Sequence, residues 1–126
     1  MAVKPVGWFE IPVRDMERAK AFYERVFDIR LEALNSPDPD ESMCVFPGQM
    51  DKGNGASGAL VKTPLLVPGS GGAVVYFMSA DCAIELARVP SNGGRIDKDK
   101  YPLGPYGFAA LITDTEGNKI GLHSMK

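Results

Sequence analysis

The sequence predicts an α+β protein in which two βαβββ modules form one cupped mixed β-sheet, with the helices on the convex face of that sheet. The first observation is a strand that ends at Val13 and leads through Asp15 into an amphipathic helix. The second is a later strand, 73–79, that leads in the same way through Asp81 into another helix. Each half then continues with short strands and no further helix, and repetition of one layout sets the architecture of a chain. We therefore expect one domain over residues 1–126.

Within this domain, module one is expected at about 6–62 and module two at about 73–126. The segment between them, about 63–72, is rich in proline and glycine and is expected to be a linker. Two such modules side by side can curve into a cup, and a cup is a natural place for a small molecule to bind.

In the first module, residues 6–13 alternate, with apolar side chains on one face and Trp8 and Glu10 on the other, which predicts a strand. The Asp15 carboxylate can accept a hydrogen bond from a free amide of the next turn, so Asp15 is a good N-cap. Residues 16–27 carry apolar side chains at helical spacing, with charges opposite, which predicts a helix. The other strands of this module are expected at 29–34, 43–46 and 58–62.

In the second module, residues 73–79 are apolar on both faces, which predicts a central strand covered on both sides. Asp81 caps a helix that is expected to run to about Val89. Later strands are expected at 95–100, 108–114 and 118–124, the last two joined as a hairpin. Two segments, 35–57 and 101–107, contain loops whose conformations the sequence does not define.

Composition excludes several classes of partner. The net charge is −2 and there is no basic stripe, so we expect no nucleic acid partner. No apolar stretch is long enough to cross a bilayer, so we expect no membrane partner. Residues Met1–Pro5 lack the apolar core of a signal peptide, and Cys44 and Cys82 have no metal-type spacing. We therefore expect a cytoplasmic protein with reduced thiols.

Four segments resemble the vicinal oxygen chelate superfamily, which comprises glyoxalases, bleomycin-resistance proteins and extradiol dioxygenases. The segments are Phe9–Asp15, Arg18–Tyr23, Phe108–Asp114 and Glu116–Leu122. The resemblance extends over nearly the whole chain and specifies the fold better than the activity. It implies a small-molecule ligand and a homodimer.

Metal-dependent members of this superfamily carry ligands on their first, fourth, fifth and eighth strands, facing the cup. By the resemblance, these positions fall on Trp8, near Leu60, on Val75 and on Gly121. None of these side chains offers the oxygen or imidazole donor that a divalent cation needs. A divalent metal cofactor is therefore disfavoured, no metal ligand is assigned and the cofactor is left unknown.

Two polar residues are the candidate catalytic groups. His123 is the single histidine and lies two residues beyond Gly121, while Glu10 lies two residues beyond Trp8, so each pair shares a strand face. A histidine beside a carboxylate is suited to proton transfer. The alternative is that both are ordinary polar residues near strand ends.

Four further residues are candidate ligand-binding groups. Trp8 offers a flat apolar surface, or else fills the space that a lost metal leaves. Tyr101 and Tyr106 lie in a loop that edges the pocket in relatives, although loop packing also explains them. The flexible thioether of Met43 suits an adaptable apolar pocket.

These observations leave two functional hypotheses. The first is a protein similar to glyoxalases and bleomycin-resistance proteins that binds a small, apolar or aromatic molecule in a metal-free concave pocket. The second is a lyase or isomerase of the same superfamily that uses Glu10 and His123 as acid and base, or as unusual metal ligands. Glutathione-dependent glyoxalase activity is not expected from the ligand positions.

Overall fold

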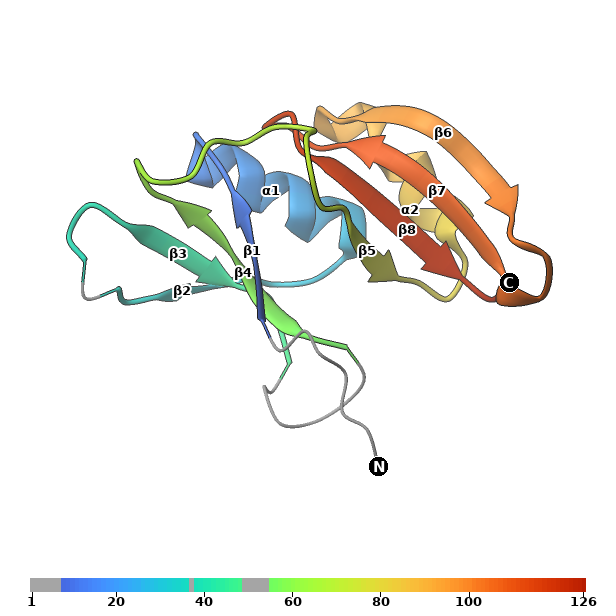
Figure 1. The fold of residues 1–126 in the computed structure, drawn as a ribbon, viewed down its shortest axis with the longest axis horizontal. Helices are drawn as coiled ribbons and strands as arrows, with labels where there is room; N and C mark the ends of the chain where they lie inside the picture. Colours follow the sequence, from blue (N-terminus) through green and yellow to red (C-terminus); the bar gives the residue numbers. More distant parts are fainter. Residues whose placement is uncertain (1–7, 37, 49–54) are drawn as a thin grey trace.

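The computed structural model describes residues 8–36, 38–48 and 55–126 (Figure 1). It confirms the α+β class with two βαβββ modules, and the first two residues of the strand expected at 6–13 lie outside the described part. The elements are β1 (Trp8–Pro12), α1 (Met16–Phe27), β2 (Glu32–Leu34), β3 (Ser42–Val45), β4 (Ser57–Lys62), β5 (Val75–Met78), α2 (Cys82–Arg88), the short 3-10 helix Pro90–Asn92, β6 (Arg95–Pro102), the 3-10 helix Gly104–Tyr106, β7 (Phe108–Thr113) and β8 (Lys119–Ser124).

The strands form two four-stranded mixed sheets with the same internal order. The first sheet has the order β1-β4-β3-β2 and the second β5-β8-β7-β6. In each sheet the strand before the helix pairs in parallel with the last strand of its module, and the other pairs are antiparallel. The modules therefore repeat not only the element order but also the pairing.

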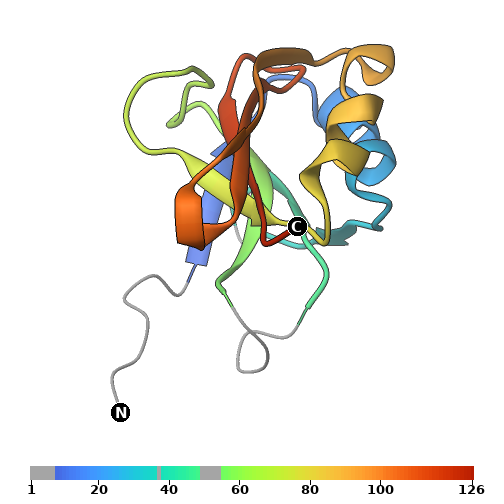
Figure 2. The same cartoon turned by 90° about the vertical axis from the view of Figure 1, so that its right-hand side faces the viewer.

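In one respect the sheets differ from the expectation of one cupped sheet: no ladder joins β1 to β5 among the described residues. Phe9 on β1 and Phe77 on β5 instead meet through their rings, with centroids 6.1 Å apart. Side chains therefore occupy the space between the two strands, and packing rather than backbone hydrogen bonding joins the sheets there. Both helices lie on the same side of the strands, as Figure 2 shows.

The helix α1 begins and ends where the sequence requires. Asp15 accepts a hydrogen bond from the Arg18 amide at 3.1 Å, which confirms the predicted N-cap. Asp28 ends the helix with φ of 53°, a left-handed conformation that asparagine and aspartate tolerate better than most residues. The apolar stripe of α1 is buried, and Tyr23 at 0% exposure lies in one core that both modules share.

The strand expected at 29–34 begins only at Glu32. Before it, the amide of Leu31 donates to the Glu24 side chain at 2.9 Å, so this stretch of backbone is bonded to α1 rather than to a neighbouring strand. The Leu31 side chain is buried in the core.

The prediction that β5 is a central, covered strand is wrong. It lies at the edge of the second sheet, and its side chains alternate between half-buried and exposed. Tyr76 is 49% exposed and Met78 is 69% exposed, whereas Val75 and Phe77 face the interior side. The apolar character of both faces arises because one face packs inward and the other borders open surface.

A buried carboxylate joins the two modules. Glu116, in the turn before β8, accepts from the amides of Arg14 and Asp15, each at 2.9 Å, and from Arg18 Nε at 2.8 Å. Burial by itself would raise the pKa of the Glu116 carboxyl, but hydrogen bonds from the Arg18 guanidinium and these amides outweigh it and lower the pKa to about 2. This contact links the start of α1 to the hairpin of the other module.

A second polar contact lies beside it. The Tyr23 hydroxyl donates to Asp114 Oδ2 at 2.7 Å, and Asn118 Nδ2 donates to the same oxygen at 3.0 Å. Burial, together with the Asp114 carboxylate, raises the pKa of Tyr23 well above its ordinary value. In the part of the chain that the structure describes, no buried side-chain nitrogen or oxygen lacks a hydrogen-bond partner.

Candidate functional site

A pocket of about 610 Å³ opens between the two modules, beside β5 and the C-terminal end of α1. Its volume lies within the roughly 300–1,000 Å³ that is typical of small-molecule sites. The lining is mostly apolar and comes from both halves of the chain: Phe9, Phe27, Ile29, Phe46, Pro47, Gly55, Ala56, Ser57, Ala73, Val74, Val75, Tyr76, Phe77, Met78 and Glu85. We call it the intermodule pocket.

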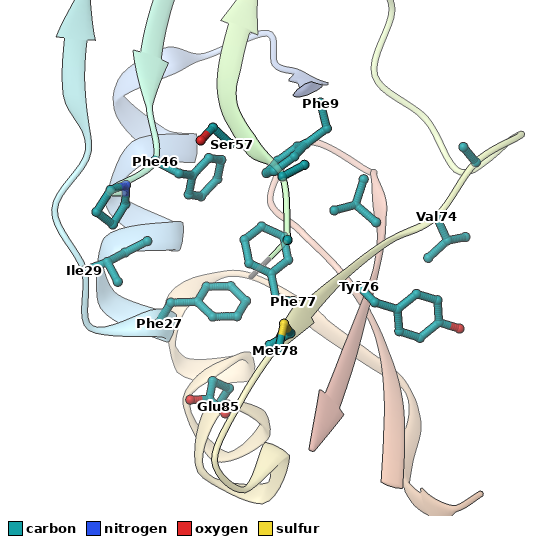
Figure 3. Close-up of a pocket in the computed structure, with 15 residues that line it drawn as sticks. Phe9, Phe27, Ile29, Phe46, Ser57, Val74, Tyr76, Phe77, Met78 and Glu85 are labelled. Atoms are coloured by element: carbon teal, nitrogen blue, oxygen red, sulfur yellow. The ribbon is translucent and has the colours of Figure 1, made fainter. Parts of the chain in front are cut away.

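Four phenylalanine rings form one side of the intermodule pocket (Figure 3). Phe27 and Phe77 stack with centroids 4.6 Å apart, Phe46 lies 5.4 Å from Phe77, and Phe9 lies 5.6 Å from Phe46. Each ring is therefore held by aromatic neighbours. Such a wall offers a ligand a rigid apolar surface.

Local sequence places these rings. Phe27 is the last residue of α1, and its ring stacks on the ring of Phe77 in β5. Phe9 lies opposite Gly58 in the β1–β4 pair, and a Cβ at Gly58 would collide with its ring. The glycine thus leaves room for Phe9 to lie flat against β4.

Ser57 and Glu85 are polar side chains that line the intermodule pocket, and Figure 3 shows them at opposite ends of it. Glu85 belongs to α2 and is half-buried. Its Oε1 accepts a hydrogen bond from the Ser79 hydroxyl, which fixes the orientation of the carboxylate. Among the described lining residues, the pocket therefore has one charged end and a long apolar body.

The predicted residues of the first module lie together on the open face of the first sheet, the face away from the helices. Trp8 Nε1 donates to Glu10 Oε2 at 3.1 Å, so these two residues share a face as the alternation predicted. Paired residues on neighbouring strands point to the same face of a sheet. Met43 pairs with Val61, and Val61 pairs with Pro12, which lies two residues beyond Glu10 on β1. Met43 therefore belongs to the face of Trp8 and Glu10. None of these three predicted residues lines the intermodule pocket.

The predicted residues of the second module lie together on the open face of the second sheet. His123 Nε2 is 2.7 Å from the Tyr106 carbonyl oxygen. Tyr101 pairs with Ala109, which pairs in turn with His123. Lys98 Nζ lies 3.9 Å from the centroid of the Tyr101 ring.

The structure therefore brings the six predicted site residues into two groups, one in each module. Glu10 bonds to Trp8 and His123 bonds to the backbone of Tyr106, and neither bonds to the other. Their roles as acid and base stay predictions.

The expected metal positions need two corrections. Leu60 is 0% exposed and lies in the core, paired with Ile11, so it does not face the cup. Val75 pairs with the buried Ile120, so it too faces the interior, and its neighbour Tyr76 is the outward residue. Both errors are register errors of one residue, which move a strand side chain to the opposite face.

The corrected open-face positions do not fit a divalent metal. Trp8 on β1, Ala59 on β4, Tyr76 on β5 and Gly121 on β8 offer no carboxylate or imidazole. A Cβ at Gly121 would collide with the ring of Tyr76, so the aromatic ring covers the position where the fold family places a ligand. Among residues 8–36, 38–48 and 55–126, no group of three or more His, Cys, Asp or Glu side chains could hold a metal ion.

Sequence reasoning missed the intermodule pocket itself. Phe27, Phe46 and Phe77 each follow a pattern that is typical of core residues, and they do pack against the core. The signal that was present is the repetition of phenylalanine at the end of α1, directly after β3 and one residue before the end of β5. A pocket requires that these ends meet, which only the relative placement of the modules determines.

The chain belongs to the Glyoxalase/Bleomycin resistance protein/Dioxygenase superfamily, whose family model matches residues 6–122. A glyoxylase-like domain-containing protein from Didymella fabae is 31% identical over 117 residues, which is 90% of this chain and 88% of that protein.

Solved structures show the same relationship. TnmS3, an antibiotic binding protein from Streptomyces sp. CB03234, superimposes with a TM-score of 0.68 at 30% identity, covering 98% of each chain. Glyoxalase I from Zea mays superimposes with a TM-score of 0.71 at 23% identity, covering 96% of this chain and 46% of that one, and shares the fold alone. The fold is thus found in both a binding protein and an enzyme.

No helix among the described residues is long and apolar enough to cross a membrane. Cys44 and Cys82 are both buried and unpaired, and burial raises the pKa of the Cys44 thiol.

Proposed function

We propose that this protein binds a small, apolar or aromatic molecule in the intermodule pocket, without a metal ion. The observation that carries the proposal is the wall of four phenylalanine rings along one side of a space of about 610 Å³. Aromatic ligands stack on or meet the edges of such rings, which contributes beyond the burial of apolar area. The likeness to an antibiotic binding protein, at 30% identity over nearly the whole of both chains, supports a binding role.

The pocket walls come from both modules. Phe9, Phe27 and Phe46 belong to the first module, whereas Phe77 and Glu85 belong to the second. A ligand in this position contacts both and stabilises their packing against each other. Binding should therefore raise the melting temperature of the protein.

The test is a thermal shift titration with naphthylethanol, a neutral bicyclic aromatic probe. At ten times the dissociation constant, binding adds about 1.4 kcal/mol, which is a rise in melting temperature of about 3–6 °C for a chain of this size. EDTA should leave the rise unchanged. If neither this probe nor other aromatic compounds raise the melting temperature up to millimolar concentrations, the proposal is wrong.

A matched pair of variants locates the site. Phe77→Leu replaces a ring that lines the pocket, and we expect it to weaken probe binding by roughly three- to tenfold. Phe108→Leu makes the same change at a half-buried ring that packs against the core outside the pocket, and should leave the affinity unchanged. Equal effects of the two variants would contradict binding in the intermodule pocket.

Glu10 and His123 remain proposed catalytic residues for the alternative, a lyase or isomerase. That alternative requires Glu10→Gln and His123→Ala to abolish turnover while both variants stay folded. The two groups bond within separate modules, so a shared proton transfer needs a substrate that reaches both.

A homodimer and a cytoplasmic location are also part of the proposal. The open face of the second sheet exposes Tyr76 and Met78, at 49% and 69%, and a second copy could cover this apolar surface. Light scattering after size exclusion should give twice the monomer mass of 13.6 kDa. Two free, buried cysteines are consistent with a reducing compartment.

A further inference from the structure

We propose that the ligand of the intermodule pocket is a protonated amine carried on an apolar or aromatic body, with Glu85 as the residue that binds its positive charge. This inference rests on the proposed function and adds the chemical class of the ligand. Among the described residues that line the pocket, Glu85 is the one charged side chain.

The Glu85 carboxylate has a fixed orientation. The Ser79 hydroxyl donates to Oε1, and Ser79 Oγ in turn accepts from the Asp81 amide at 3.0 Å. Glu85 also lies in the first turn of α2, where the helix dipole favours a negative charge. The carboxylate is therefore held in place as an acceptor. Its other oxygen, Oε2, accepts no hydrogen bond from a described residue.

The charge of Glu85 has no partner within the described part of the chain. No ion pair there includes it. Arg88, three residues further along α2, instead donates to the Val26 carbonyl oxygen at 3.0 Å. Lys100 pairs with Asp81 at 2.9 Å. Arg88 and Lys100 are thus bonded elsewhere, and no ion pair among the described residues offsets the charge of Glu85 at the pocket.

The surroundings of Glu85 favour a cation over any other ligand group. Figure 3 shows Glu85 at the same end of the pocket as Phe27 and Met78, and Phe27 stacks on Phe77 at 4.6 Å. Phenylalanine faces attract cations, and a carboxylate beside apolar side chains gains most from a positive partner. An ammonium group there also supplies hydrogen-bond donors to Oε2. A ligand carboxylate at this end would be repelled.

The rest of the pocket fixes the other half of the ligand. Beyond Phe77 the lining continues through Phe46 to Phe9 and includes no further charged side chain among the described residues. This stretch suits an aromatic or aliphatic body. The lining formed by the described residues therefore suits an amphipathic cation, with the charge at the α2 end.

The experiment uses three probes that share one bicyclic ring: naphthylethylamine, naphthylethanol and naphthylacetate, which are positive, neutral and negative at pH 7. Affinities are measured by isothermal titration calorimetry at low salt on the full chain. We expect the amine to bind roughly five- to tenfold more tightly than the alcohol, because a charge-assisted hydrogen bond at a half-buried site is partly screened. The acetate should bind more weakly than the alcohol.

Variants connect this preference to Glu85. In Glu85→Gln, the amine and the alcohol should bind equally, and in Glu85→Lys the order should reverse in favour of the acetate. Glu17→Gln removes an exposed carboxylate from the first turn of the other helix and should keep the preference of the unmodified protein. Circular dichroism and melting temperature establish that each variant is folded.

The outcomes are distinguishable. If the alcohol binds and the amine binds no better, or if Glu85→Gln keeps the amine preference, the inference is wrong while the proposed function stands. If none of the three probes binds, both the inference and the proposed function are overturned for aromatic ligands of this size.

Discussion

Replacing Glu116 with glutamine should weaken the contact that joins the two modules. The side chain of Glu116 is fully buried, and its two oxygens accept hydrogen bonds from Arg14, Asp15, Arg18 and Thr115. An amide in its place keeps one acceptor oxygen but turns the other into a donor that faces donors. The variant therefore loses both the charge and part of the hydrogen bonding.

The size of the effect follows from the pKa and the burial. A carboxyl whose pKa falls from 4.5 to about 2 on folding contributes at most about 3 kcal/mol at neutral pH. Arg18 is 52% exposed, so solvent screening reduces its share. An unsatisfied buried group adds about 1–3 kcal/mol. We expect Glu116→Gln to lower the free energy of unfolding by about 2–3 kcal/mol, which is a fall in melting temperature of roughly 6–12 °C.

The assay is urea unfolding followed by circular dichroism, with Asp97→Asn as the matched control. The pKa of Asp97 is also lowered to about 2, but its partners Arg95, Thr113 and Lys119 all belong to the second module. Arg95 is 72% exposed, and the group around Asp97 does not connect the two modules, so the control should cost only about 1 kcal/mol. A loss below about 0.5 kcal/mol for Glu116→Gln, or equal losses for the two variants, would show that Glu116 does not hold the modules together.

Three further predictions concern stability. First, the pKa values of Glu116 and Asp97 are lowered on folding, so the unfolded chain binds more protons than the folded one at acid pH. The free energy of unfolding should therefore be greatest above about pH 5 and fall as the pH drops from there toward 2. Acid unfolding monitored by fluorescence should show this fall, and a flat profile over that range would contradict it. Second, Tyr23→Phe removes the 2.7 Å hydrogen bond to a buried carboxylate and should cost about 1–2 kcal/mol in urea unfolding, an unchanged midpoint being the contrary result. Third, Gly94→Ala puts a Cβ 2.6 Å from a phenylalanine ring and 2.9 Å from a backbone carbonyl oxygen, so it should lower the free energy of unfolding by about 1–3 kcal/mol. Gly71→Ala is the control, because a Cβ there has nothing within 4 Å, and it should be near neutral in the same assay.

Local patterns predicted the elements well. The alternation in β1 and the helical spacing after Asp15 both reflect interactions within a few residues, which a single sequence carries directly. The repeat of strand and helix likewise predicted the two modules. The position of β5 in its sheet was predicted wrongly, because apolar residues on its outer face give the same sequence pattern whether another layer covers that face or a pocket borders it.

The candidate site was predicted less well for a related reason. Glu10 and His123 were correctly placed on strand faces with Trp8 and Gly121, because faces follow from alternation. Which groups lie across from each other depends on how the modules pack, and that depends on contacts between distant segments such as Phe9 with Phe77. Glu85 carries no pattern of its own, so only the structure shows that it faces the pocket.

We propose above that an aromatic molecule binds in the intermodule pocket without a metal ion. The most direct test of this proposal is an NMR titration of the isotopically labelled protein with naphthylethylamine in the presence of EDTA. Chemical shift changes should concentrate at Phe27, Phe46, Phe77 and Glu85. Changes centred instead on the open face around His123, or binding that EDTA abolishes, would contradict it.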